Sequence, residues 1–136
     1  MTSKQIGNIG ESRAIYEFVK RNIPVYIPFG DNESADLIAD FKGKLNKIQV
    51  KTSLSPKIEG AYEFTTARRP TGKGERIKYS SNEVDYFVFY AKEIDNIFLV
   101  PYSEIENKAS FTIRYKNGNN KSHLAENYSF DKVINE

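Results

Sequence analysis

Three polar side chains suited to chemistry on a phosphate group lie within residues 34–53, SADLIADFKGKLNKIQVKTS. They are the carboxylate of Asp36, the amide of Gln49 and the ammonium group of Lys51. Carboxylate, amide and main-chain oxygens are hard ligands of the kind that Mg²⁺ prefers, and the carbonyl of Val50 adds one more. A metal ion beside a positive charge can activate water and neutralise a phosphate under attack. The stretch therefore indicates a magnesium site for phosphoryl chemistry, with Lys51 in an electrostatic role.

Two short strands must bring these groups together. Their apolar residues alternate with polar ones, which is typical of half-buried strands. The alternating apolar residues are Leu37, Ala39, Phe41, Ile48 and Val50. Because successive side chains of a strand point to opposite faces, Asp36, Gln49 and Lys51 are predicted to share the face away from the core. A turn centred on Gly43 and Lys44 places Asp36 directly opposite Lys51 and diagonal to Gln49.

The same spacing has an ordinary structural explanation. An aspartate opposite a lysine is also a common pair on the solvent-facing surface of a sheet, where it contributes little beyond solubility. The spacing of Asp36 and Lys51 alone leaves both interpretations open.

A helix is predicted over residues 8–22, where Ile15, Phe18 and Val19 form an apolar stripe. Asn8 is a candidate N-cap, and Glu11 follows it three residues later, as in a capping box. Pro24 ends this helix, because the residue before a proline is driven out of the helical conformation.

The rest of the chain is predicted to consist mainly of strands. They are expected at residues 25–29, 61–66, 85–91, 96–101 and 110–116, with a helical turn over 102–109 and an ambiguous end over 124–136. A helix followed by strands in one chain of this length indicates a single α/β domain, bordering on α+β, over residues 1–136.

Bulk composition is that of an ordinary globular protein. The chain has 136 residues, a formal net charge of +2 and no cysteine, so it has neither disulfides nor thiolate metal ligands. The polar first residues do not resemble a signal peptide, and no apolar run approaches the about 20 residues that a transmembrane helix needs. We therefore expect a cytoplasmic protein without a membrane partner.

A basic segment over residues 67–79, ARRPTGKGERIKY, contains five positive charges against one glutamate. The basic residues are Arg68, Arg69, Lys73, Arg76 and Lys78. Phosphate contacts dominate the affinity of proteins for nucleic acids, so a loop of this charge is a candidate for binding the DNA backbone. An ordinary solvated loop is the alternative. His123, the only histidine, has no ligand partner at a useful spacing and is expected at the surface.

A helix that carries a glutamate, then Asp36, then Gln-x-Lys on the next strand resembles the PD-(D/E)xK nuclease superfamily, in the variant where glutamine replaces the second acid. The matching pieces are IGESRAIYEFVKRNIPVYIPFGDNESADLIAD, KIQVKTS and VDYFVFYAKEIDNIFLVP, which cover most of residues 6–101. The chain is most similar to the group I intron-associated homing endonucleases of this superfamily and, more distantly, to Holliday junction resolvases.

The resemblance implies a restriction-endonuclease-like core, a mixed β-sheet flanked by helices, that hydrolyses phosphodiester bonds of double-stranded DNA with Mg²⁺. Glu11 would support the metal, Asp36 would be its main ligand, Gln49 would stand in the second acidic position and Lys51 would be the motif lysine. Two departures matter: the glutamine carries no charge, and Ala35 replaces the proline of the "PD" pair. Capping of the helix remains an equal explanation for Glu11.

The function that this resemblance implies is a site-specific DNA endonuclease of the homing type. A structure-specific nuclease such as a junction resolvase, a catalytically inactive DNA-binding module and a plain α+β interaction domain are the alternatives. Cutting both strands needs two active sites, so a homodimer or a homotetramer is expected. The segment Tyr102 to Tyr115 or the C-terminal segment is the expected interface.

Overall fold

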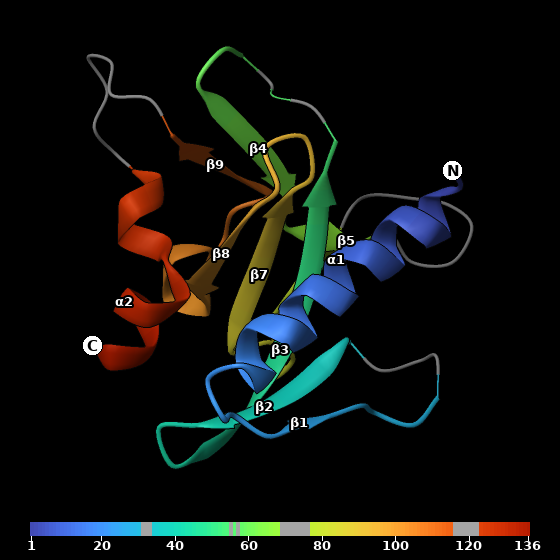
Figure 1. The fold of residues 1–136 in the computed structure, drawn as a ribbon, viewed down its shortest axis with the longest axis vertical. Helices are drawn as coiled ribbons and strands as arrows, with labels where there is room; N and C mark the ends of the chain where they lie inside the picture. The colour runs from blue at the N-terminus through green and yellow to red at the C-terminus, as the bar shows by residue number, and fades with distance from the viewer. Residues whose placement is uncertain (31–33, 55, 57, 69–76, 116–122) are drawn as a thin grey trace.

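A mixed five-stranded sheet forms the centre of the protein (Figure 1). The computed structural model describes residues 1–30, 34–54, 56, 58–68, 77–115 and 123–136. The strands of the central sheet, in spatial order, are β1 (Val25–Tyr26), β2 (Leu37–Phe41), β3 (Lys44–Ser53), β7 (Tyr86–Ala91) and β8 (Asn96–Pro101). Only β3 and β7 run parallel, and the other neighbouring strands are antiparallel. The predicted mixed sheet is therefore confirmed.

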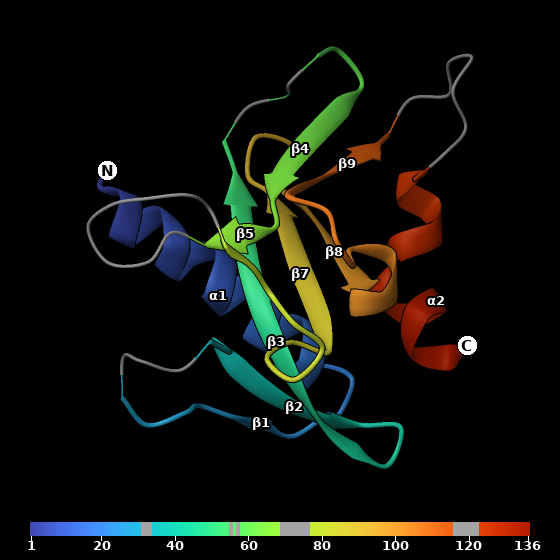
Figure 2. The ribbon, with the colours of Figure 1, turned by 180° about the vertical axis from the view of Figure 1, so that it is seen from behind.

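Helices cover one face of this sheet and further strands cover the other (Figures 1 and 2). The helices are α1 (Ser3–Val19) and α2 (Phe130–Asn135), and two short 3₁₀ turns, η1 (Tyr102–Glu104) and η2 (Ala125–Tyr128), lie in the second half of the chain. The additional strands form two antiparallel pairs, β4 (Ala61–Thr65) with β9 (Ser110–Arg114) and β5 (Ala67–Arg68) with β6 (Ile77–Lys78).

Each face of the sheet has its own hydrophobic core. On the helical face, the ring of Phe18 in α1 packs against those of Phe41 and Phe130. On the opposite face, Phe89 stacks between Phe64 and Phe111. All six rings are at most 6% exposed, so these aromatic residues serve packing and are not available to stack on bases.

The first helix begins earlier than predicted. It starts at Ser3, because Thr2 and Gln5 form a capping box: the Thr2 hydroxyl accepts from the Gln5 N–H, and the Gln5 side chain accepts from the Thr2 N–H. The prediction of Asn8 as N-cap is therefore wrong. Glu11 lies in the middle of the helix, and it has no capping role there.

The buried side of α1 also differs from the predicted stripe. Its buried residues are Gly10, Ala14, Glu17 and Phe18, whereas Val19 is 54% exposed. Burial alone would raise the pKa of the Glu17 carboxyl, but hydrogen bonds from Arg21 and Lys20 outweigh it and hold that pKa below its usual value. A buried carboxylate that is paired in this way can occupy a position normally filled by an apolar residue.

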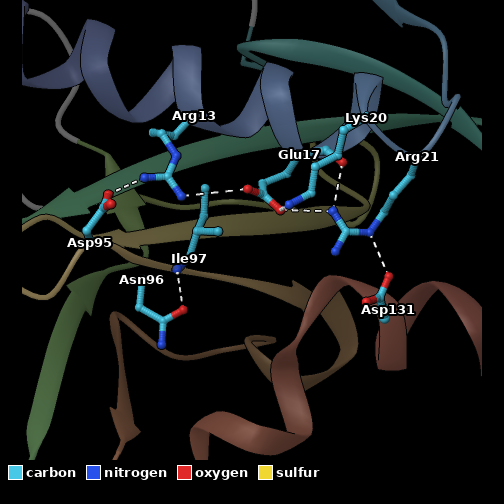
Figure 3. Close-up of polar contacts among 8 residues, drawn as sticks. All are labelled: Arg13, Glu17, Lys20, Arg21, Asp95, Asn96, Ile97 and Asp131. Carbon is cyan, nitrogen blue, oxygen red and sulfur yellow. Dashed lines mark hydrogen bonds and ion pairs between the residues drawn. The ribbon is translucent and has the colours of Figure 1, made fainter.

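The ion pairs around Glu17 connect α1 to the turn between β7 and β8 and to α2, as Figure 3 shows. Arg21 bonds Glu17 and also Asp131 of α2, with Nη1 and Nε each 2.8 Å from a carboxylate oxygen. Arg13 pairs with Glu17 and with Asp95, in the turn between β7 and β8. The network therefore fixes the helix against the sheet and against α2.

The hairpin of β2 and β3 has a different register from the predicted one. Leu37 pairs with Ile48, and the two central residues of the turn are Lys42 and Gly43, with φ of +56° and +71°. Two positive φ values are typical of a type I′ turn, which matches the twist of the strands. The prediction of a turn at Gly43 and Lys44 is wrong by one residue. Moving the turn by one residue changes the cross-strand partner of each residue by two positions. Because side chains alternate with a period of two, the predicted division of side chains between the two faces is kept.

Other predicted elements are confirmed in part. Residues 61–66 and 96–101 are strands nearly as expected, whereas the strand expected over 25–29 is reduced to Val25–Tyr26. Beyond it, Phe29 is fully exposed. The segment expected to be a loop over 67–79 begins and ends in the β5–β6 pair. The ambiguous C-terminal end contains η2 and α2.

Two smaller expectations also change. His123 is not a plain surface residue, because its half-buried ring stacks on Phe111 with the centroids 4.2 Å apart. In the segments expected to form a subunit interface, Ile105, Ile113 and Val133 are each at most 3% exposed. These side chains already serve the core of the chain itself. No helix among the described residues is both long and apolar enough to cross a membrane.

The contact between α1 and β3 gives a first prediction. A Cβ added at Gly10 would lie 2.2 Å from Oγ1 of Thr52, whereas one added at Gly7 would meet no atom within 4 Å. We expect Gly10→Ala to lower the free energy of unfolding by about 1–3 kcal/mol through overpacking. Gly7→Ala should raise it by about 1 kcal/mol or less, because alanine favours the helix. Urea denaturation of each variant measures the change.

A second substitution separates overpacking from other causes. Thr52→Ala removes Oγ1 and leaves Cβ, which lies 3.6 Å from the added atom, an ordinary contact. The double variant Gly10→Ala with Thr52→Ala should therefore lose less stability than the sum of the two single variants. Additive losses would show that the close approach of α1 to β3 is not what requires a glycine.

Candidate active site

The backbone ladder between β2 and β3 ends at Asp36, and the side chain of Asp36 continues it. The Asp36 N–H donates to the carbonyl of Ile48 at 2.8 Å. The next donor on β3 that faces β2, the N–H of Val50, bonds Oδ2 of Asp36, also at 2.8 Å. A carboxylate thus takes the place of a main-chain carbonyl at the end of the hairpin. This bond fixes the carboxylate of Asp36 beside β3.

Gln49 bonds the same carboxylate oxygen. Its Nε2 donates to Oδ2 of Asp36 at 2.9 Å, and Gln49 is only 8% exposed. The observed register places Gln49 level with Asp36, where the prediction had placed Lys51. Both donors contact Oδ2, which leaves Oδ1 for a further ligand.

The charge of Asp36 is unfavourable in this position. Burial raises the pKa of its carboxyl, and the bond from Val50 and the positive charge of Lys51 offset this only in part. The native protein therefore binds a proton at Asp36 more readily than an exposed aspartate does.

The negative charge of Asp36 also affects Glu11, on the helical side of the sheet. Burial and then the negative charge of Asp36 raise the pKa of the Glu11 carboxyl. Glu11 follows Gly10, the residue that brings α1 closest to Thr52 of β3, so the helix carries it toward the end of the hairpin. The carboxyl groups of Glu11 and Asp36 thus both have raised pKa values, and the charge of Asp36 contributes to the shift of Glu11.

Lys51 projects from the same face of β3 as Gln49, two residues further along. Its Nζ lies 3.3 Å from Oη of Tyr79 and 5.4 Å from the centroid of the Tyr79 ring. Tyr79 is 7% exposed, and its carbonyl accepts a hydrogen bond from Oη of Tyr102 at 2.9 Å. The ring of Tyr79 therefore orients the side chain of Lys51. Lys51 was predicted to lie directly opposite Asp36 but lies two residues further along β3, from where its charge still offsets part of the rise in the pKa of Asp36.

Tyr79 was not identified from the sequence. It lies 28 residues after Lys51 and directly follows β6, so no local spacing connects the two. The only sequence signal is its place at the end of the basic segment, and this does not indicate a contact with the lysine.

The donor set suits a hard divalent ion. It comprises two carboxylates, the amide of Gln49 and the carbonyl of Val50, which points toward β2 because the N–H and C=O of a strand residue face the same neighbour. Within the described part of the chain, no three His, Cys, Asp or Glu side chains gather as a metal site. Oxygen ligands with few charges match Mg²⁺ better than Zn²⁺, which favours nitrogen and sulfur. A bound cation would also relieve the repulsion between Glu11 and Asp36.

Only some of the basic residues predicted to bind DNA lie among the residues that the structure describes. Lys78 is exposed in β6, and the backbone of Arg68 lies opposite Ile77 in the β5–β6 pair. Arg69, Lys73 and Arg76 lie outside the described residues. The prediction for this segment therefore depends on its charge and on the position of Lys78.

Comparisons with known proteins identify a family and a similar solved structure. Residues 1–131 match a family described as PD-(D/E)XK endonuclease. The structure is similar to that of a bacterial homing endonuclease, I-Ssp6803I, with a TM-score of 0.80 and 27% sequence identity, over 94% of this chain and 88% of that one. Comparison with curated proteins finds no match. The predicted resemblance and the restriction-endonuclease-like core are confirmed.

The raised pKa values predict how stability depends on pH. The folded-state pKa of Glu11 lies above its unfolded value, so the native state holds the proton to higher pH and stability falls as pH rises through that window. Without divalent metal, we expect Glu11→Gln to raise the free energy of unfolding at neutral pH and to flatten this fall. Thermal denaturation in EDTA across the acidic to neutral range measures both effects.

The matched control is Glu106→Gln, which neutralises an exposed glutamate. It should change stability little and leave the pH dependence as in the wild type. If Glu11→Gln is no more stable than the wild type at neutral pH, Glu11 does not carry an unfavourable charge.

Proposed function

Because the chain belongs to the PD-(D/E)XK endonuclease family, we propose that it hydrolyses phosphodiester bonds in double-stranded DNA with Mg²⁺ as its metal ion. The proposed catalytic residues are Glu11, Asp36, Gln49 and Lys51. The observation that carries this proposal is that all of these residues interact with the carboxylate of Asp36. Asp36 accepts from Gln49, its charge adds to the rise that burial causes in the pKa of Glu11, and the charge of Lys51 offsets part of the rise that burial causes in the pKa of Asp36.

Asp36, Glu11, Gln49 and the carbonyl of Val50 are the groups that would hold the metal. When bound, Mg²⁺ supplies positive charge for the phosphate and lowers the pKa of water. The protein positions these groups before the reaction, because Val50 and Gln49 fix Oδ2 of Asp36. Such preorganisation avoids the cost of orienting ligands when the substrate binds.

Lys51 has an electrostatic role in this proposal. Its ammonium group is held by Tyr79, on the same face of β3 as Gln49, where it can stabilise the negative charge that develops on the phosphate. The ring of Tyr79 attracts the ammonium group and so supports this electrostatic role.

DNA is held in this proposal by the basic segment over residues 67–79, whose cations contact phosphates. The similarity to a homing endonuclease favours a site-specific enzyme that acts on the DNA inside the cell. Cleavage of both strands requires two copies of the site, which a homodimer or homotetramer would supply.

Cleavage assays test this function directly. Supercoiled plasmid, linear duplex and a four-way junction are incubated with the protein in Mg²⁺ and in EDTA. We expect cuts only with Mg²⁺, and a rate lower by about a hundredfold or more for Asp36→Asn and for Lys51→Ala. Lys78→Ala, which removes an exposed phosphate contact, should weaken DNA binding and leave the rate of cutting bound DNA nearly unchanged.

Each other outcome points to a different function. A strong preference for the junction would favour a structure-specific nuclease. DNA binding without cutting in any divalent metal would favour an inactive binding module. Cutting by Lys51→Ala at the wild-type rate would show that this lysine has no catalytic role.

Tyr79 should act as a positioning residue for Lys51. Tyr79→Phe keeps the ring over the ammonium group and removes the hydroxyl, so kcat should fall by about tenfold, the low end for residues that orient a functional group. Tyr79→Leu removes both contacts, and its kcat should fall further while KM for DNA stays the same. Cleavage rates measured over a range of DNA concentrations separate the two quantities.

A second tyrosine–lysine contact supplies the control. The ring of Tyr16, on the exposed surface of α1, lies 5.1 Å from Nζ of Lys20. Tyr16→Leu should leave kcat unchanged. Equal losses for Tyr79→Phe and Tyr79→Leu would contradict a role for the ring in holding Lys51.

A further inference from the structure

A hollow lies next to the candidate active site that none of the proposed catalytic residues lines. Its volume is about 260 Å³. It is lined by Pro28, Ser34, Ala35, Ile38, Lys47, Asn82 and Glu83. Ile38 and Lys47 are paired across β2 and β3 and lie on the same face as Asp36 and Gln49. The hollow is therefore one two-residue step along the hairpin from the Asp36 carboxylate, a distance of about 7 Å.

Two hydrogen bonds fix the polar walls of this hollow. Oγ of Ser34 donates to Oε2 of Glu83 at 2.7 Å, which joins the segment before β2 to the turn before β7. Nζ of Lys47 donates to the carbonyl of Asn82 at 2.7 Å. The walls thus present a carboxylate, an ammonium group, a hydroxyl and an amide in a defined arrangement.

The lining matches a nucleobase better than a phosphate. Pro28, Ala35 and Ile38 offer an apolar surface for the faces of a flat ring, and the polar walls offer donors and acceptors for its edges. The carboxylate of Glu83 balances the ammonium group of Lys47, which bonds the carbonyl of Asn82, so the walls carry no excess positive charge to hold a phosphate. The volume is just below the roughly 300–1,000 Å³ of pockets for drug-sized ligands, so it suits one ring system and not a whole nucleotide.

We propose that this hollow is a subsite for a single base, that of a nucleotide flanking the phosphate to be cut. This inference rests on the proposed nuclease function and deepens it. A base that is paired in a duplex must leave the stack to enter such a pocket, which costs least for a mismatched or unpaired base. The subsite would therefore make cutting sensitive to the base and to its pairing next to the cleaved bond.

Binding of free nucleotides tests the subsite without any need for cleavage. The isotope-labelled protein in EDTA is titrated with the four deoxynucleoside 5′-monophosphates and, separately, with deoxyribose 5-phosphate, and its NMR signals are followed. We expect the nucleotides to shift the methyl signals of Ile38 and the side-chain amide signals of Asn82 saturably, and the sugar phosphate to leave them in place. Nucleotides that leave both sets of signals unmoved would overturn the proposal.

Two variants of the lining and one of the active site complete the test. Ala35→Phe fills the hollow and Asn82→Ala removes an edge contact, so each should weaken nucleotide binding, the former by about tenfold or more. Asp36→Asn, which removes a proposed catalytic charge, should bind nucleotides as the wild type does while failing to cut DNA. Unchanged affinity in Ala35→Phe, with its fold checked by circular dichroism, would contradict the base subsite.

A duplex experiment follows once the cut has been mapped on plasmid DNA. We expect the wild type to cut faster when the flanking base pair is mismatched, and this advantage to disappear in Ala35→Phe. Equal sensitivity to the mismatch in both proteins would place the effect elsewhere and overturn the assignment. If the wild type cuts no DNA at all, the nuclease function is refuted. The nucleotide titration then still tests the base subsite, because it does not depend on cleavage.

Discussion

The candidate site depends on one hydrogen bond, from the N–H of Val50 to the carboxylate of Asp36. Because this bond occupies a position in the ladder between β2 and β3, the backbone of the hairpin fixes the carboxylate. A side chain held in the ladder can be reached from both faces of the sheet. Gln49 contacts it from β3, and the charge of Asp36 contributes to the raised pKa of Glu11, on the helix that covers the other face. The two strands and the helix must all be in place before the groups meet.

This arrangement has an energetic cost that the rest of the fold must offset. Glu11 and Asp36 both have raised pKa values, so at neutral pH their charges oppose folding. The core on the helical face and the ion pairs from Arg21 to Glu17 and Asp131 hold α1 on the sheet despite this repulsion. Carboxyl groups with perturbed pKa values are typical of functional sites.

The sequence predicted which face of the hairpin carries the candidate residues but not the register of its strands. Alternation of apolar residues was sufficient to place Asp36, Gln49 and Lys51 on one face, because the period of a strand is local. The turn was misplaced because Lys42 adopts a positive φ, a conformation usually associated with asparagine, aspartate or glycine. Long-range contacts were the least predictable. No pattern in the neighbouring sequence shows that Tyr79 contacts Lys51, or that the charged Glu17 is buried in an ion-pair network.

The central claim is that Asp36 and Glu11 are paired carboxyl groups whose charge is relieved by a divalent cation. Calorimetric titration of Mg²⁺ at mildly acidic pH, in buffers of different ionisation enthalpy, tests it most directly. The account predicts that binding releases protons, so the measured heat depends on the buffer, and that Asp36→Asn abolishes binding. Mg²⁺ binding that releases no protons, or that persists in Asp36→Asn, would contradict it.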